Sequence, residues 1–153
     1  MKYYNKSCYK GEWENDHWHG KGIYRKPYGH IYDGQWSKGL KQGQGKEIKG
    51  KVVYQGQFEN DRKKGYGKLV QNGSRLSFGT RFGYNFRLKF TYVGQFKKNQ
   101  MNGIGQMTIP GGDIIEGPFK KDRLHGKGYV YLRNGDIMLG DFKRGRLYGQ
   151  GTC

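Results

Sequence analysis

The sequence predicts an all-β fold: an elongated single antiparallel sheet of six stacked β-hairpins, each hairpin being one copy of a short repeat. Three observations predict it. A pattern of glycines and aromatic residues recurs six times along the 153 residues. The chain has 28 glycines and no alanine, which disfavours helices because glycine costs about 1 kcal/mol relative to alanine inside one. Phe, Trp and Tyr make up 16% of the residues, so rings supply the buried surface.

The composition also bounds the class of protein. Ile, Leu, Val and Phe together number 29 of 153 residues, and the formal net charge is +17. That balance alone is typical of disordered chains, but disordered chains are poor in aromatic residues. No stretch approaches the roughly 18 apolar residues that a membrane-spanning helix needs, and the N-terminus shows no secretory signal. We therefore expect residues 1–153 to form one cytoplasmic repeat domain.

A repeat spaced by 22 or 23 residues, with one interval of 38, accounts for most of the chain. We number each unit from position zero, and the six units start at Tyr9, Tyr32, Tyr54, Tyr92, Ile115 and Met138. Glycine stands at positions two, eleven and thirteen of every unit. Position four is always a ring, and we expect these rings to pack the repeats together. They are Trp13, Trp36, Phe58, Phe96, Phe119 and Phe142.

Each unit has the pattern of a β-hairpin. Positions zero, two and four share one face of a first strand, and a β-branched residue precedes position zero from the second unit on. Position seven is Asp, Asn or Gly, residues that tolerate the positive φ of a tight turn. A turn at positions six and seven pairs position two with eleven and zero with thirteen, although a shift of one or two residues also fits. We expect the ring of one hairpin to lie over the glycines of the next.

Further turns connect the units, and two places depart from the pattern. Asn72-Gly73, Gly111-Gly112 and Asn134-Gly135 are predicted turns between one hairpin and its successor. Pro118 removes a strand donor, so unit five should carry a bulge or an edge. The long third unit contains an insertion at about residues 74–90, whose second half alternates like a strand.

These units, of the form Tyr-x-Gly-x-Trp followed by Gly-x-Gly (Tyr32 to Trp36, then Gly43 and Gly45), resemble the membrane occupation and recognition nexus (MORN) repeat family. The resemblance covers nearly the whole chain. It implies an elongated, twisted sheet of stacked hairpins with a grooved aromatic face, used as a scaffold in ciliary, junctional and cytoskeletal proteins. It implies no reaction.

The residues give no support for an enzyme. Gly45 to Val52 is one residue short of a phosphate-binding loop, but that loop needs a strand before it and a helix after it. His17 and His19 supply half of a metal site at most, and surface histidines explain them better. The carboxylates form no recurring acid/base pair or triad. We therefore expect no catalytic residue, no cofactor and no metal.

The predicted hairpin tips are selectively basic. Positions five to ten of units two to six hold 13 of the 29 Lys and Arg residues. Two interpretations stay open: the cations keep the sheet edge from aggregating, or they bind an acidic protein surface or a lipid surface. The candidate binding cations among these tip residues are Lys97, Lys98, Lys120, Lys121 and Arg144.

The insertion is rich in rings and cations and has no acidic residue. It either covers its own sheet or forms an aromatic and basic tab for a partner, and we favour the tab because little other apolar surface is available for it to cover. The candidate anchors are Phe82, Tyr84, Phe86, Phe90, Arg81 and Arg87.

Together these features favour a non-enzymatic scaffold that docks other proteins in a cytoskeletal assembly, above all a ciliary axoneme. The cytoskeletal location rests on the family resemblance alone. The alternative is a peripheral membrane protein that uses the basic row on anionic phospholipid. Nucleic-acid binding ranks below both, because the rings that would stack on bases are committed to packing the hairpins.

Overall fold

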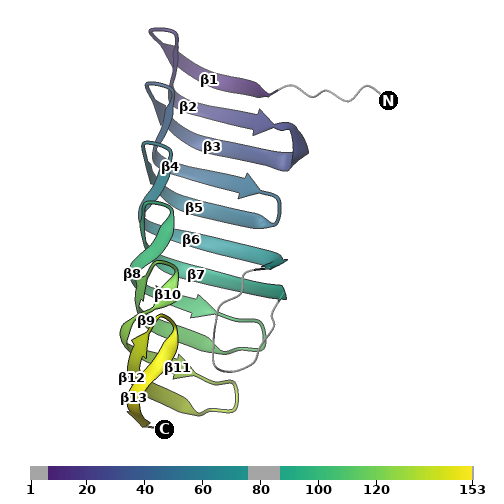
Figure 1. The fold of residues 1–153 in the computed structure, drawn as a ribbon. Helices are drawn as coiled ribbons and strands as arrows, with labels where there is room; N and C mark the ends of the chain where they lie inside the picture. Colours follow the sequence, from purple (N-terminus) through teal and green to yellow (C-terminus); the bar gives the residue numbers. More distant parts are fainter. Residues whose placement is uncertain (1–6, 76–86, 153) are drawn as a thin grey trace.

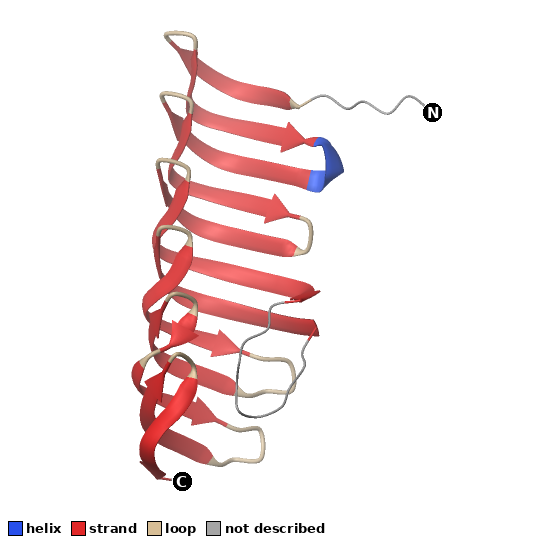
Figure 2. Cartoon of the chain, in the orientation of Figure 1, coloured by secondary structure: helices blue, strands red, loops and turns tan. Residues whose placement is uncertain are grey.

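In the computed structural model, which describes residues 7–75 and 87–152, the chain forms one open antiparallel sheet of 13 strands. The described residues contain no α-helix, and their one helical segment is the 3-10 turn η1 (Pro27–Gly29; Figure 2). The strands are β1 (Cys8–Glu14), β2 (His17–Lys26), β3 (His30–Ser37), β4 (Leu40–Lys49), β5 (Val52–Glu59), β6 (Arg62–Arg75), β7 (Arg87–Lys97), β8 (Gln100–Thr108), β9 (Ile114–Lys120), β10 (Arg123–Leu124), β11 (Gly126–Tyr131), β12 (Ile137–Lys143) and β13 (Arg146–Thr152).

The strands lie side by side in chain order, which confirms the predicted fold class. Each unit is one hairpin, and the return strand of unit five is divided into β10 and β11. Figure 1 shows the hairpin tips along one long edge of the sheet and the connections between units along the other, with β1 and β13 at opposite ends. No helix in the described residues is long and apolar enough to cross a membrane.

The tip turns have the predicted backbone conformation. Positions six and seven both take positive φ, as at Asn60 (φ 47°) and Asp61 (φ 64°), which is the geometry of a type I′ turn. Next to the turn the predicted register also holds, because Phe58 faces Lys63.

Beyond the first few pairs, the register shifts by two residues. Gly56 faces Gly67 in place of the predicted Gly65. The shift arises because Gly65 takes φ 62° and bulges out of the return strand. The same irregularity falls between Gly11 and Glu12, Gly34 and Trp36, and Gly94 and Phe96.

This register places a row of glycines across the sheet. Gly34, for example, faces Gly22 on one side and Gly45 on the other. The ring of Tyr32 lies over this row, and a Cβ on Gly45 would stand 2.7 Å from Tyr32 Cε2. The ring that covers these glycines is therefore the tyrosine of the same hairpin, and not, as we expected, a ring of the neighbouring hairpin.

Contact between successive hairpins comes from the rings at position four. Phe58 lies edge-on between Tyr32 of the preceding unit and Tyr54 of its own, at centroid distances of 5.0 and 5.1 Å. The rings of units two to six at this position are 3–7% exposed, whereas Trp13 is 59% exposed. Trp13 differs because no hairpin precedes unit one among the described residues.

Hydrogen bonds also join each tip to the preceding hairpin. The Asp61 N–H donates to the Lys41 carbonyl (3.1 Å), and the Lys41 N–H donates to Asp61 Oδ1 (2.9 Å). Asn99 and Asp122 repeat this pair of bonds on Lys63 and Met101. In units two and six position seven is glycine, and only the main-chain bond forms.

The connecting turns follow the predictions in part. Gly111-Gly112 and Asn134-Gly135 lie between strands as expected, but Asn72-Gly73 does not form a turn, because β6 continues to Arg75 and Gly73 (φ 82°) sits at an irregularity within it. Pro118 lies inside β9, facing Ile104, and the irregularity predicted for unit five appears in its return strand, which is interrupted at His125.

Candidate functional site

The face opposite the tyrosines carries an exposed apolar patch in units three and four. Side chains alternate along a strand, so Tyr66, Val93 and Ile104, each next to a row glycine, point away from the aromatic face. They are 60%, 48% and 56% exposed. Tyr66 faces Gln95, and Ile104 faces Pro118. We call Tyr66, Val93 and Ile104 the outer patch.

The outer patch interrupts a row that is polar in the preceding units. At the position of Tyr66 and Ile104, units one and two have Lys21 and Gln44, and these face Gln35 and Gln57. The change from amide and ammonium groups to a phenol and an aliphatic side chain occurs without any change in register. The apolar side chains of the outer patch are therefore not a consequence of how the strands pair.

The tips of units four to six carry an exposed cluster of cations. None of these residues forms an ion pair with another described residue, and the carboxylate in these turns, Asp122, accepts a hydrogen bond from the Met101 N–H. We call this set the basic tips: Lys97, Lys98, Lys120, Lys121, Arg123, Lys143, Arg144 and Arg146. Five of them are the predicted binding cations, and the structure brings those five to one edge.

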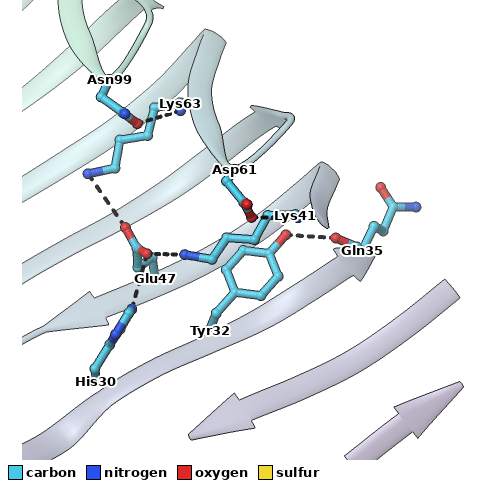
Figure 3. Close-up of polar contacts among 8 residues, drawn as sticks. All are labelled: His30, Tyr32, Gln35, Lys41, Glu47, Asp61, Lys63 and Asn99. Carbon is cyan, nitrogen blue, oxygen red and sulfur yellow. Dashed lines mark hydrogen bonds and ion pairs between the residues drawn. The ribbon is translucent and has the colours of Figure 1, made fainter. Parts of the chain in front are cut away.

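Two other predicted tip cations lie elsewhere. Lys41 and Lys63, at position nine of units two and three, turn onto the aromatic face, where their side chains are 13% and 16% exposed (Figure 3). Lys41 Nζ stands 4.9 Å from the centroid of the Tyr32 ring, and Lys63 Nζ stands 5.0 Å from that of Tyr54. They are therefore not part of a solvated basic edge.

The carboxylate of Glu47 holds these two lysines. Glu47 pairs with Lys41, lies 3.8 Å from Lys63 Nζ, and lies 3.2 Å from His30 Nε2. Burial by itself raises the pKa of the Glu47 carboxyl, but the hydrogen bond and charge of Lys41 and the charge of Lys63 outweigh it, so the pKa is lowered. Burial lowers the pKa of Lys63. This group is a partly buried ion cluster inside the repeat stack.

The predicted tab can be placed only at its edges. Arg81, Phe82, Tyr84 and Phe86 lie outside the described residues, and of Arg87 only its main chain in β7 is described. Phe90 belongs to the core, where it is 4% exposed. Its prediction as an exposed partner anchor is wrong, because the alternation of β7 directs it to the tyrosine face, two residues before Tyr92.

The structure also shows where the histidines and the segment resembling a phosphate-binding loop lie. His17 Nδ1 lies 2.5 Å from the Asn15 carbonyl, and His19 Nδ1 lies 3.0 Å from Glu14. The described residues contain no group of three His, Cys, Asp or Glu side chains arranged for a metal ion. The segment from Gly45 to Val52 belongs to β4, a turn and β5.

Comparison with known proteins assigns the family. The MORN repeat family model matches residues 9–30, 32–50, 54–75, 92–114 and 116–137, which is more than half of the chain. The chain belongs to the MORN repeat family. The five matches correspond to the first five hairpins, and β12 and β13 add a sixth MORN-like hairpin with the same glycine row and ring. MORN repeats indicate a repeat protein that interacts with proteins or membranes.

One curated relative is MORN repeat-containing protein 3 from Xenopus laevis. It is 41% identical over 70 residues, an alignment that covers 39% of this chain and 28% of the relative. The similarity thus spans less than a third of the relative's length.

The structure assigns roles that the sequence interpretation missed. At position three, Glu12, Gln35 and Gln95 each accept a hydrogen bond through Oε1 from the N–H of the residue between the two glycines of Gly-x-Gly. These side chains satisfy the main chain at the bulge. Unit five has Pro118 at this position, which has no such oxygen, and there the return strand is interrupted. The recurrence of Glu or Gln at position three was the signal that could have revealed this.

Proposed function

We propose that this MORN repeat protein is a non-enzymatic scaffold whose outer patch docks another protein. The observation that carries the proposal is the exposure of Tyr66, Val93 and Ile104 on the outer face of the sheet, at positions where the neighbouring units are polar. An exposed aromatic and aliphatic group with a polar rim is typical of the centre of a protein interface. The basic tips, which begin in unit four at the edge of the sheet, suit a partner with acidic groups around its contact surface.

The cellular setting of the proposal is a cytoskeletal assembly, with the ciliary axoneme as its leading form. This part rests on the family resemblance of the repeats. Cytoplasmic localisation and membership of such a complex are tested by imaging a tagged chain in ciliated cells, where enrichment along the axoneme is expected. A uniform distribution outside cilia would contradict it.

Substitution in the outer patch tests the docking role. We expect Tyr66→Gln with Ile104→Gln, which gives both positions the residue of Gln44 in unit two, to lower recovery of cross-linked cytoskeletal partners at least about tenfold. The thermal unfolding midpoint should stay within about 2 °C of the unmodified chain, because both side chains are exposed. Lys46→Gln, at the corresponding exposed position of β4 and facing Gln55, is the matched control and should bind normally. Unchanged recovery with the double variant would remove the outer patch from the proposal.

A membrane role is the second candidate, and the basic tips favour it. Each Lys or Arg near an anionic surface contributes about 1 kcal/mol, and eight such side chains stand without ion-pair partners among the described residues. Sedimentation with phosphoinositide vesicles at physiological salt distinguishes the two functions. Binding that disappears in the variant Lys97→Glu, Lys98→Glu, Lys120→Glu, Lys121→Glu supports the membrane role. Absence of vesicle binding leaves the protein-docking role.

A further inference from the structure

Unit one presents groups that later units use to dock on the hairpin before them. Asp16 stands at position seven with the same positive φ (59°) as Asp61 (64°). Asp61 gives its N–H to Lys41 and accepts the Lys41 N–H through its carboxylate. Within the described residues Asp16 makes neither bond. Its side chain has the chemistry of the tip contact, but no strand in the described part of the chain receives it.

Trp13 likewise has no preceding hairpin among residues 7–75 and 87–152. Its counterparts Trp36 and Phe58 are 4% and 3% exposed, because each packs on a tyrosine of the unit before, whereas Trp13 is 59% exposed. A large indole that is open to solvent at the end of an aromatic stack is a strong anchor for association.

The opposite end of the sheet presents the complementary groups. Among the described strands, β13 pairs with β12 alone, and β1 pairs with β2 alone. Leu147, at position nine of unit six, corresponds to Lys41 and Met101, whose main chains receive the next tip. Met138, at position zero, corresponds to the tyrosines on which the next ring packs, and a thioether packs well against an indole.

The charges at the two ends are also complementary. The tip of unit one contains Glu14 and Asp16, whereas that of unit six contains Lys143, Arg144 and Arg146. In the stack, position seven lies beside position eight of the preceding unit: a Cβ on Gly145 would stand 3.8 Å from Arg123 Cβ. If unit one of one copy followed unit six of another, the same geometry would place Asp16 of the first copy beside Arg146 of the second.

We propose that two copies of this chain associate head to tail, with unit one of one copy docking on unit six of the second copy. β1 then pairs with β13, Asp16 bonds to the main chain of Leu147, and Trp13 packs on Met138. The contact is heterologous, so repetition extends the sheet into a filament. The inference concerns the ends of the sheet and does not depend on what the outer patch binds.

The net charge of +17 does not oppose this contact at physiological salt. The Debye length is about 8 Å at 0.15 M ionic strength, so repulsion between distant parts of two copies is largely screened, while charges in contact still interact. A sheet edge with unpaired main-chain groups favours strand addition.

Two variants of the full chain, each blocked at one end, test the proposal. In the head variant, Trp13→Ser with Asp16→Gly removes the ring and the hydrogen-bond acceptor from unit one. Glycine is compatible with this turn because units two and six have glycine at position seven. In the tail variant, Arg146→Glu places a carboxylate on unit six, where it would face Asp16 of the docking copy. Each variant alone should weaken self-association at least about tenfold.

Sedimentation velocity of the mixture gives the decisive result. The unmodified chain should grow in mass with concentration, and the two variants together should form a 1:1 dimer that grows no further, since only one head and one tail stay intact. Arg123→Glu, the same charge change at position eight of unit five, is the control and should associate normally. A monomeric unmodified chain up to about 100 µM, the range of weak specific binding, overturns the proposal whatever the variants do. A mixture of the two variants that stays monomeric would also overturn it. So would self-association of the variant Trp13→Ser with Asp16→Gly that equals that of the unmodified chain.

Discussion

Glu47 of unit two lies 3.8 Å from Lys63 of unit three, on the face that carries the aromatic core. Lys41 and His30 contact the same carboxylate, so one anion is surrounded by three basic side chains. Unit four has Met101 and Met107 at the positions of Lys41 and Glu47, and these methionines are 2% and 6% exposed. These positions of the repeat therefore accommodate either an ion cluster or apolar side chains.

Removing the carboxylate of Glu47 should destabilise the folded chain. We expect Glu47→Gln to lower the free energy of unfolding by about 3 kcal/mol, because it leaves two partly buried ammonium groups without a counter-charge. Denaturant unfolding followed by circular dichroism measures the change. A loss of only about 0.5 kcal/mol, the value for exposed pairs, would show that the cluster behaves as a surface feature.

Replacing the whole cluster should have a different outcome. The variant Lys41→Met, Glu47→Met, Lys63→Met replaces the ion cluster of units two and three with methionines like those of unit four. We expect a stability equal to or above that of the unmodified chain, because no buried charge is left unpaired. If the triple variant is less stable than Glu47→Gln, then the ions contribute more than their desolvation costs.

The lowered pKa of Glu47 predicts a pH dependence. The carboxyl titrates near 4.5 in its ordinary state and lower in the folded chain, so its contribution is complete above the unfolded pKa and is lost as the pH falls through the folded pKa. We expect the stability difference between the unmodified chain and Glu47→Gln to narrow below about pH 4.5. Thermal unfolding of both chains from pH 7 to pH 3 measures it. A constant difference would contradict the lowered pKa.

Local patterns made the fold predictable, while side-chain direction limited the prediction of the site. Position seven and the ring at position four identified turns and repeats because both are defined by residue type. The register shift was not predictable from the hairpin pattern, since Gly65 and Gly67 are the same residue with different roles: one bulges and the other lies under Tyr54. Lys63 was misplaced because a lysine suits a solvated tip as readily as a ring face.

The glycine row should tolerate no side chain. We expect Gly105→Ala to cost about 1–3 kcal/mol, because a Cβ there overlaps the ring of Tyr92. Gly103 is a different case, since it bulges at φ 107° against the Gln95 side chain and not against a ring. Chemical unfolding measures the loss at Gly105. Tyr92→Leu in the Gly105→Ala background should recover part of it, and an additive result would show that the ring is not the obstacle.

The tip contacts predict that asparagine can replace aspartate at position seven. Burial raises the pKa of Asp122, so its charge is costly in the folded chain. Asp122→Asn keeps the acceptor for the Met101 N–H, as Asn99 does for Lys63, and should leave stability at pH 7 unchanged or higher. Asp122→Ala should lower it by about 1–2 kcal/mol through the lost hydrogen bond and the positive φ. Equal stability of the two variants would contradict the role of the side-chain bond.

Deleting residues 74–88 tests the inserted segment and restores the 23-residue spacing. Gln71 and Phe90 are paired, and the deletion leaves Asn72, Gly73 and Lys89 between them, a three-residue connection like η1 between the paired Lys26 and His30. Each repeat is stabilised by its own contacts and its neighbours, so we expect the sheet to fold.

Partner binding should fall in the deleted form, because Arg81, Phe82, Tyr84, Phe86 and Arg87 are then absent. Pull-down of cross-linked partners, with a melting curve for each form, measures both effects. Phe90→Ala is the control: Phe90 is buried, so we expect it to cost about 3 kcal/mol while the folded fraction still binds. If the deletion unfolds the chain and recovery follows the folded fraction alone, the segment serves the sheet and the tab hypothesis is wrong.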